Sequence, residues 1–187
     1  MSHLSRRDFL AAMGASAAAA SWAGATESGP GASGNPAIFD WRPPKGEIRK
    51  PRAIRPDEKM NVACIGIGGK GTTDSMAMQS ENVVALCDVD EGPGKFKKIY
   101  ETYPNARRFK DYREMLEEMD GQIDAVTVST PDHTHFPAAM EAIRRGKHAF
   151  VQKPLTRTIW EARVLADAAR LHGVATQMGN QGHAAEG

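Results

Sequence analysis

The chain has 187 residues, of which 24 are lysine or arginine and 23 are aspartate or glutamate, so its formal net charge is +1. This balance gives no overall attraction to nucleic acid or to an anionic membrane surface, and we expect no nucleic-acid partner. The hydrophobic fraction of 41% is enough for an ordinary core, and the length indicates one domain with additional segments.

Residues 1–25 have the pattern of a targeting segment. The run Ser-Arg-Arg-Asp-Phe-Leu at positions 5–10 is typical of a twin-arginine signal, and Ala-Gly-Ala at 23–25 suits cleavage after small residues. The alanine-rich stretch between them is too weakly apolar to predict a transmembrane helix. Because the twin-arginine route carries folded cargo, the sequence predicts its export machinery as a partner and a periplasmic or other extracytoplasmic location. A disordered basic N-terminus is the alternative.

Residues 26–59 are rich in glycine, proline and charged residues and show no apolar periodicity. This composition predicts a linker that packs, if at all, as an extended arm. Its basic residues are interspersed with prolines and acidic residues, so a solvated arm is favoured over a nucleic-acid-binding tail.

The pattern changes at Met60, where short apolar runs typical of buried parallel strands begin to alternate with helical segments. The alternation predicts βαβ units, so the expected fold class is α/β, a Rossmann-type doubly wound parallel sheet over residues 60–180. We expect strands within 60–68, 82–90, 107–109, 123–131, 148–154 and 174–179, and helices within 69–80, 94–103, 111–119, 135–146 and 158–173.

Cys64 and Cys87 both lie in apolar runs, and small buried hydrophobic residues are the favoured interpretation. A disulfide stays open as an alternative, because adjacent strands of an exported protein could bring the two cysteines together. Trp160 begins an apolar stripe at helical spacing that includes Val164 and Leu165, and we expect the whole stripe in the core.

A glycine-rich segment with the pattern G-x-G-x-x-G lies directly between the first predicted strand and the first predicted helix. The first glycine permits a tight turn, and the second lets the backbone approach a pyrophosphate. The third allows the helix to pack closely on the sheet, with the phosphates at the helix N-terminus. The candidate cofactor-binding residues of this segment are Gly66, Gly68, Gly69, Lys70 and Gly71.

Asp88 ends the second predicted strand, where a carboxylate can accept hydrogen bonds from the ribose of an adenosine. Strand, glycines, helix, strand and acid in one unit predict dinucleotide binding, with S-adenosylmethionine as the main alternative ligand. No arginine follows Asp88, and Asp90 adds a second carboxylate that a 2′-phosphate would meet. The sequence therefore favours NAD, with NADP less favoured.

Residues 60–187 resemble the N-terminal half of the Gfo/Idh/MocA oxidoreductase family, which includes inositol dehydrogenases and glucose–fructose oxidoreductase. The resemblance rests on four stretches, CIGIGGKG, VVALCDVDE, IDAVTVSTPDHTHFPAAMEAIRRGKHAFVQKPLT and ATQMGNQGH. The third stretch is the most specific, because Thr-Pro, His, Gly-Lys-His and Lys-Pro follow one another in it.

The resemblance implies roles for four further residues. In the family a Thr-Pro loop lies beside the nicotinamide ribose, which implicates Thr130 and Pro131 here. The family's Glu-Lys-Pro motif aligns with Gln152 and Lys153, and its lysine hydrogen-bonds the oxygen of the reacting carbinol, so Lys153 inherits a catalytic role. Gln152 departs from the usual glutamate: it carries no charge but can still hydrogen-bond a ribose hydroxyl.

Two histidines and an asparagine complete the candidate set. His133 and His135 are open to polar roles beside the cofactor or substrate or at a helix start, and His135 is the candidate catalytic residue. The pair has no third ligand nearby, so we expect no metal site. Asn180 follows the last predicted strand, at the edge where cofactors bind.

Family members continue into a second α/β domain that supplies the substrate pocket. Residues 181–187 are expected to begin the connection to that domain, which is absent from this chain. The resemblance implies the cofactor half of an NAD-dependent dehydrogenase acting on a sugar, polyol or related carbinol, inactive as this fragment alone. We expect a homo-oligomer for the full-length protein. A redox-neutral, NAD-dependent glycoside hydrolase or lyase and a non-catalytic NAD-binding protein are the alternatives.

Overall fold

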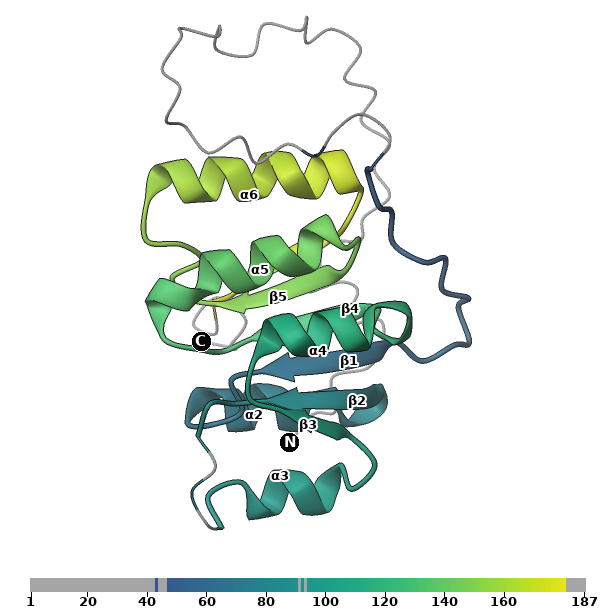
Figure 1. The fold of residues 1–187 in the computed structure, drawn as a ribbon, viewed down its shortest axis with the longest axis vertical. Coiled ribbons are helices and arrows are strands. Elements are labelled where there is room, and N and C mark those ends of the chain that lie inside the picture. The colour runs from purple at the N-terminus through teal and green to yellow at the C-terminus, as the bar shows by residue number, and fades with distance from the viewer. Residues whose placement is uncertain (1–42, 44–46, 91, 93, 181–187) are drawn as a thin grey trace, which may run out of the picture.

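The computed structural model describes residue 43, residues 47–90, residue 92 and residues 94–180. A six-stranded sheet with the order β3-β2-β1-β4-β5-β6 forms its centre, and every neighbouring pair of strands is parallel (Figure 1). The strands are β1 (Asn61–Ile65), β2 (Asn82–Cys87), β3 (Arg107–Phe109), β4 (Ala125–Val128), β5 (His148–Gln152) and β6 (Thr176–Gly179).

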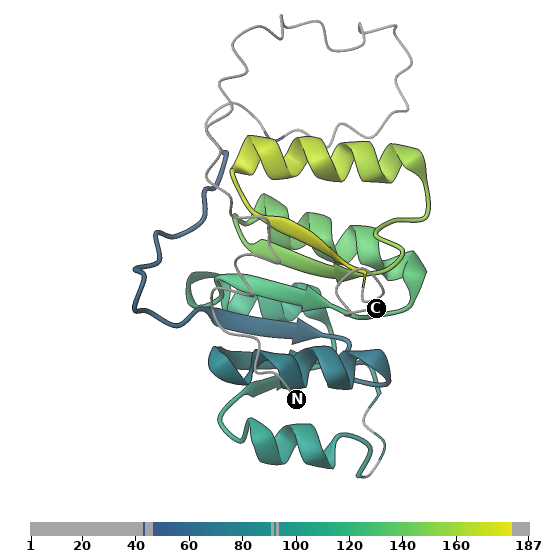
Figure 2. The ribbon, with the colours of Figure 1, turned by 180° about the vertical axis from the view of Figure 1, so that it is seen from behind.

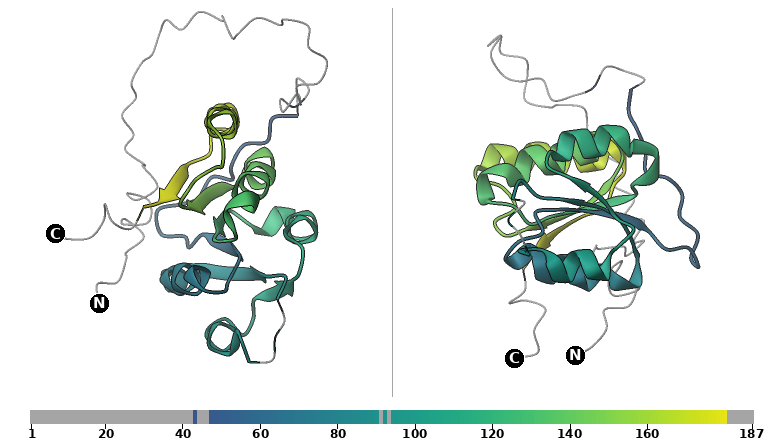
Figure 3. Two further views of the ribbon diagram at one scale, coloured as in Figure 1. Left: turned by 90° about the vertical axis from the view of Figure 1, so that its left-hand side faces the viewer. Right: turned by 60° about the horizontal axis from the view of Figure 1, so that its bottom comes forward.

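Helices cover both faces of the sheet. Two of them, α2 and α3, pack on one face, and α4, α5 and α6 pack on the other (Figure 3). Seen from behind, α2 lies in front of the sheet (Figure 2). The helices are α2 (Lys70–Ala77), α3 (Lys97–Thr102), α4 (Tyr112–Glu118), α5 (His135–Arg144) and α6 (Ile159–His172), with short 3₁₀ turns at η1 (Met78–Ser80), η2 (Asp120–Gln122) and η3 (Asp132–Thr134).

Alternation along β1 explains why its sequence is apolar throughout. Ala63 and Ile65 belong to the core under α4, α5 and α6, whereas Val62 and Cys64 belong to the core under α2 and α3. A strand that is buried on both faces has no polar side to show, which is typical of parallel sheets. The expected doubly wound parallel sheet is therefore confirmed, and the strand order reverses direction between β1 and β4.

The termini of α6 were predictable from local chemistry. Thr158 accepts a hydrogen bond from the backbone N–H of Glu161, while the Glu161 carboxylate accepts one from the backbone N–H of Thr158. This capping box starts the helix. Gly173 ends the helix in the left-handed region at φ 70°, where glycine carries no Cβ penalty.

One expectation about buried residues differs from the structure in part. Trp160 is 45% exposed and lies beside Phe136 with the ring centroids 5.9 Å apart, so its expected place in the core was wrong, although Val164 and Leu165 are buried. Trp160 stands in the first turn of α6, on the solvent side of the helix entry.

Cys64 and Cys87 are both free and buried. They point toward opposite faces of the sheet, since Cys64 lies in the core under α2 and Cys87 in the core under α4. Burial raises the pKa of both thiols, that of Cys87 to about 12. The interpretation as small buried hydrophobic residues is confirmed, and the geometry excludes the disulfide alternative.

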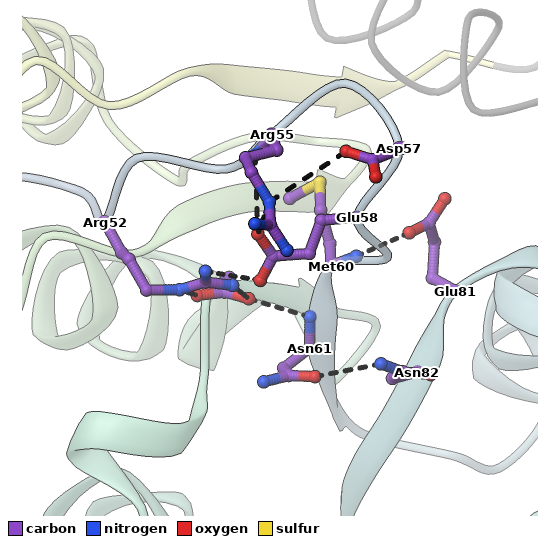
Figure 4. A network of polar contacts seen from close by, with 9 residues as sticks. Arg52, Arg55, Asp57, Glu58, Met60, Asn61, Glu81 and Asn82 are labelled. Atoms are coloured by element: carbon purple, nitrogen blue, oxygen red, sulfur yellow. Dashed lines mark hydrogen bonds and ion pairs between the residues drawn. The ribbon is translucent and has the colours of Figure 1, made fainter.

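The segment from residue 47 to residue 59 packs as an extended arm along the edge where the strands begin (Figure 1). Arg52 donates to both oxygens of Asp124 at 2.9 and 2.8 Å, and it also contacts Glu58 (Figure 4). Asp124 accepts a further hydrogen bond from the backbone N–H of Asn61. Hydrogen bonds thus attach the arm to Asp124, directly before β4, and through Asp124 to the start of β1.

Contacts further up the arm join it to α5 and α6. The Nζ of Lys50 donates to the carbonyl of Leu171 at 2.7 Å, and His172 Nδ1 donates to the carbonyl of Arg49 at 2.8 Å. A Cβ at Gly146 would lie 2.7 Å from the Lys50 carbonyl, so only glycine admits the arm there. The described part of the predicted linker is therefore a fixed part of the domain, while positions 1–42 and 44–46 lie outside the described residues.

Polar contacts also fix where β1 and β2 begin. Glu81 is buried, and its carboxylate accepts the backbone N–H of Met60 at 2.7 Å, while Asn82 Nδ2 donates to Asn61 Oδ1 (Figure 4). Across the described ranges, no helix is long and apolar enough to cross a membrane.

Candidate cofactor site

A cleft of about 530 Å³ opens at the carboxyl ends of β1, β2 and β4, beside the point where the strand order reverses. Its walls come from the glycine-rich turn after β1, the acidic loop after β2, the loop after β3 and the Thr-Pro loop after β4. Ligands of doubly wound sheets bind at this edge and at this reversal, because the loops there diverge to opposite faces.

The glycines of the turn have separate structural duties. A Cβ at Gly71 would lie 2.0 Å from the carbonyl oxygen of Gly66, so the third glycine lets α2 pack on the turn. Gly66 has φ 78°, and a Cβ there would meet the Ser129 carbonyl at 2.7 Å. Gly68 lines the cleft, and Gly69 occupies the N-cap of α2 with φ 52° and open space around it. The tight turn at Gly66 and the close packing at Gly71 are the roles that the sequence pattern predicts for the first and third glycines.

Asp88 is held in place by the turn that it faces. Its Oδ2 accepts the backbone N–H groups of Ile67 and Gly68 at 2.9 and 3.2 Å, and its Oδ1 accepts that of Asp90 at 3.0 Å. A carboxylate has about four acceptor positions, so one remains for a ribose hydroxyl. Asp88 also lines the cleft, at the position that the sequence predicts for it.

Thr130 and Pro131 line the opposite wall of the cleft. The Oγ1 of Thr130 is buried and has no hydrogen-bond partner among the described residues. A buried hydroxyl without a partner is costly, so a ligand that supplies one would relieve the cost. This orphaned atom fits a polar ligand bound in the cleft.

The two histidines after β4 lie in different surroundings. His135 is 1% exposed, with its Nδ1 at 2.6 Å from the Pro154 carbonyl and its Nε2 at 2.8 Å from the Thr130 carbonyl. Both ring nitrogens face backbone carbonyls, and a neutral imidazole can donate to only one of them at a time. The ring is a clamp between two loops, and the catalytic role of His135 stays a prediction. His133 is exposed and lines the cleft instead.

A buried carboxylate that the sequence analysis did not single out connects three segments of the site. Asp74, on α2, accepts hydrogen bonds from Ser129 Oγ at 2.7 Å and from Gln152 Nε2 at 2.8 Å, and it pairs with Lys70 Nζ at 3.0 Å. Lys70 and Gln152, both predicted to bind cofactor, therefore contact Asp74 in the structure.

Lys153 and Asn180 lie at the same edge but outside the cleft. Lys153 is exposed directly after β5, one strand beyond β4, and Asn180 follows β6 at the end of the sheet. The side chain of Lys153 is thus accessible from solvent at this edge of the sheet.

Sequence reasoning missed the basic residues of the cleft. Lys95 and Lys110 line it, and the Lys95 ammonium pairs with Asp90. Lys110 directly follows β3, so the rule that placed Asp88 at the carboxyl edge could also have placed Lys110 there. Val89, 85% exposed, gives the acidic loop an apolar surface beside the cleft.

The site has the components of a dinucleotide cradle. A glycine turn that admits close backbone approach, a helix start whose N-cap is Gly69, and the fixed acid Asp88 meet at one reversal point. Together they define an NAD-binding Rossmann domain. Residues 60–180 match the family described as "Oxidoreductase family, NAD-binding Rossmann fold", and the chain belongs to this Gfo/Idh/MocA family.

The chain is also similar to curated proteins named as glycosyl hydrolases. It is 32% identical to glycosyl hydrolase family 109 protein 2 of Shewanella sp. (strain ANA-3) over 187 residues, covering 91% of this chain and 38% of that protein. The same identity, over 60% of the chain and 26% of the relative, links it to glycosyl hydrolase family 109 protein 1 of Shewanella sp. (strain MR-4). The chain thus spans well under half the length of these relatives.

Solved structures share the fold. Scyllo-inositol dehydrogenase from Lactobacillus casei, with bound NAD(H) and scyllo-inositol, superposes with a TM-score of 0.61 at 19% identity, covering 69% of this chain and 38% of that one. GenD2 from gentamicin A biosynthesis, in complex with NAD, superposes with a TM-score of 0.59 at 30% identity, covering 69% and 36% of the two chains.

Proposed function

We propose that this domain binds NAD in preference to NADP and serves an oxidoreductase whose substrate is a sugar, a polyol or a related carbinol. The observation that carries the proposal is the cleft at the strand-order reversal, with Asp88 fixed against the glycine turn. In this arrangement the turn and the start of α2 would hold the pyrophosphate, and Asp88 the adenosine ribose. The exposed Val89 offers the adenine an apolar surface.

The preference for NAD rests on charge. A 2′-phosphate on the adenosine ribose would approach the carboxylates of Asp88 and Asp90, and like charges at such short range oppose binding. Lys95, the nearest basic side chain in the acidic loop, is already paired with Asp90. The bare hydroxyl of NAD meets Asp88 as a hydrogen-bond donor instead.

The reaction that this site supports is hydride transfer at a carbinol carbon. NAD supplies the hydride chemistry when it is bound. On the protein side, Thr130 Oγ1 is a buried hydroxyl without a partner among the described residues that could bond to the nicotinamide end, and Lys153 can donate a hydrogen bond to the substrate oxygen. Orientation of that oxygen is the contribution expected of Lys153, and a second domain of the full-length protein would enclose the substrate.

Calorimetric titration of the full-length protein with NAD and with NADP tests the cofactor assignment. We expect NAD to bind at least about tenfold more tightly, and Asp88→Ala to lower NAD affinity by at least about tenfold without changing the far-UV circular dichroism. Asp57→Ala, an exposed acid of the arm, is the matched control and should leave the affinity unchanged. Equal binding of NAD by the wild type and Asp88→Ala would refute the ribose assignment.

A redox-neutral glycosidase is the second candidate, favoured by the 32% identity to glycosyl hydrolase family 109 proteins over 91% of the chain. In such an enzyme the carbinol would be oxidised to a ketone, with its hydride taken up by NAD, and the neighbouring C–H proton and the glycosidic alcohol would then be eliminated. Water would add across the resulting double bond and the hydride would return to the carbonyl, so the net reaction is hydrolysis and the bound NAD ends as it began. Glycoside cleavage with no net change in absorbance at the reduced-nicotinamide band would support this candidate. Stoichiometric appearance of reduced nicotinamide would support the dehydrogenase.

The proposal also includes export of the protein from the cytoplasm. The twin-arginine pattern at positions 5–10, which lies outside the described residues, favours a protein that folds around its cofactor and then crosses the membrane. NAD retained in this way would be recycled on the protein. Fractionation of cells that express the full-length protein, followed by identification of the nucleotide released on denaturation, tests both points. Protein confined to the cytoplasm would contradict the export proposal.

A further inference from the structure

Asp74, on α2, hydrogen-bonds to residues at the carboxyl ends of two other strands. Its side chain is 8% exposed, yet it carries three polar contacts: Ser129 Oγ at 2.7 Å, Gln152 Nε2 at 2.8 Å and Lys70 Nζ at 3.0 Å. Ser129 immediately precedes Thr130, and Gln152 immediately precedes Lys153. A single carboxylate therefore bonds the glycine-turn helix to both segments expected at the nicotinamide end.

The contact fixes which way the Gln152 amide points. A carboxylate only accepts hydrogen bonds, so the NH₂ of Gln152 must face Asp74, and its carbonyl oxygen must face the other way. That oxygen accepts the backbone N–H of Lys153 at 3.3 Å. The result is a continuous chain of hydrogen bonds from α2 through Gln152 to the backbone of Lys153.

The surroundings leave the Gln152 amide little freedom. Gln152 is 5% exposed, and a Cβ added to Gly179 on β6 would lie 2.8 Å from its Nε2. The absence of a side chain at Gly179 thus makes room for the amide in the position that Asp74 holds. A buried donor that lost its acceptor here would bear the full cost of desolvation.

We propose that Asp74 is the positioning residue of this site. It supplies, from α2, the negative charge that the neutral Gln152 lacks, and it holds the segments of Thr130 and Lys153 in register with the glycine turn. The inference rests on the proposed NAD binding. Asp74 acts through Gln152 and Ser129 and does not itself touch the cofactor.

An isosteric exchange of the two side chains tests the proposal in the full-length protein. Gln152→Glu places two carboxylates against each other, so NAD affinity should fall by about tenfold or more. The double variant Asp74→Asn/Gln152→Glu restores one amide and one carboxylate with the polarity reversed, and its affinity should return to within about threefold of the wild type. Gln122→Glu, at an exposed position on the opposite edge of the sheet, adds the same charge and should change nothing.

The measurements are the NAD dissociation constant by calorimetry and the midpoint of thermal unfolding. Recovery of affinity in the double variant supports the pairing of Asp74 with Gln152. If the two side chains acted independently, Asp74→Asn would add its own loss of affinity to that of Gln152→Glu and would not repair it. If Gln152→Glu does not fold, a folded double variant that binds NAD is the same rescue. A double variant that binds no better than Gln152→Glu, or a Gln152→Glu variant with wild-type affinity, overturns the proposal.

NAD binding by the wild-type protein distinguishes a failure of the proposed function from a failure of the proposed role of Asp74. Failure of the wild-type protein to bind NAD refutes the proposed function on which the inference depends. Binding by the wild type, with no rescue in the double variant, refutes the role of Asp74 alone.

Discussion

The guanidinium of Arg52 and the carboxylate of Asp124 form a two-pronged contact, at 2.9 and 2.8 Å, that bonds the arm to the entry of β4. Burial alone would raise the pKa of Asp124, but the hydrogen bonds from Arg52 and Asn61 outweigh it and leave that pKa below its ordinary value. The side chain of Asp124 is almost completely buried, whereas Arg52 keeps part of its surface in solvent. A charged, hydrogen-bonded pair therefore attaches the arm to the interior of the domain.

Arg52→Ala should lower the free energy of unfolding by about 1–3 kcal/mol, because it removes charge-assisted hydrogen bonds from a buried carboxylate. Urea denaturation at neutral pH measures the change. Arg55→Ala removes an arginine of the same arm whose ion pairs are exposed and 3.9 Å long, and it should cost no more than about 0.5 kcal/mol. Equal losses of unfolding free energy in the two variants would show that the contact of Arg52 with Asp124 adds no more stability than an exposed ion pair.

His148 predicts a pH dependence of stability. Burial lowers its pKa, against a smaller opposing effect of Asp124, and its Nδ1 accepts the backbone N–H of Ala175 at 3.0 Å. Below the ordinary histidine pKa of about 6.5 the unfolded chain takes up a proton that the folded chain resists. Stability from this residue is therefore fully present above that value and is lost as the pH falls through the lower, folded pKa.

His148→Asn keeps an acceptor for Ala175 but cannot take up the proton. The difference in unfolding free energy between the wild type and this variant should move against the wild type between pH 7.5 and pH 5, as measured by urea denaturation at each pH. A difference that stays constant over this range would contradict the assignment of a neutral, buried His148.

Alanine substitutions of His135 and His133 should differ in their effect on the unfolding free energy. His135→Ala removes both contacts of the clamp and leaves the Thr130 and Pro154 carbonyls without that donor, so the unfolding free energy should fall by about 1–3 kcal/mol. His133→Ala changes an exposed residue and should stay within about 0.5 kcal/mol of the wild type. Loss of activity in full-length His135→Ala at wild-type stability would support the predicted catalytic role of His135 instead.

Gly71 gives the sharpest steric test. Gly71→Ala would place a Cβ 2.0 Å from the Gly66 carbonyl, so α2 must move away from the turn, with loss of NAD binding and of stability. Gly121→Ala, where a Cβ meets nothing within 4 Å, is the control and should leave both unchanged or raise stability slightly. Thermal unfolding with and without NAD measures both effects, and NAD binding by Gly71→Ala would refute the close packing.

Much of the fold could be predicted because its signals are local. The strand at Arg107–Phe109 and the start of α5 at His135 were placed correctly, since apolar runs and helix starts depend on neighbouring residues. The glycine turn and Asp88 were found for the same reason, because one βαβ unit contains both. Helix ends were less accurate: α2 ends at Ala77 and continues as a 3₁₀ turn.

The parts that could not be predicted depend on contacts between distant segments. Asp74 meets Gln152 only because β1 and β5 flank β4, and His135 meets Pro154 only because the loops after β4 and β5 lie side by side. From the sequence, His135 and His133 were both polar residues after a strand, and no local signal indicated that His135 would be the buried one. The arm had no periodic signal because its order comes from single contacts such as that of Arg52 with Asp124.

The arm meets the sheet at the edge where strands begin, whereas the cleft lies at the edge where they end. A fluorophore or a surface attachment placed at Glu47 would therefore stand on the far side of the molecule from the nucleotide. Immobilising the protein through that point would leave the binding crevice facing the bulk solution, which suits sensors and flow reactors built on this domain.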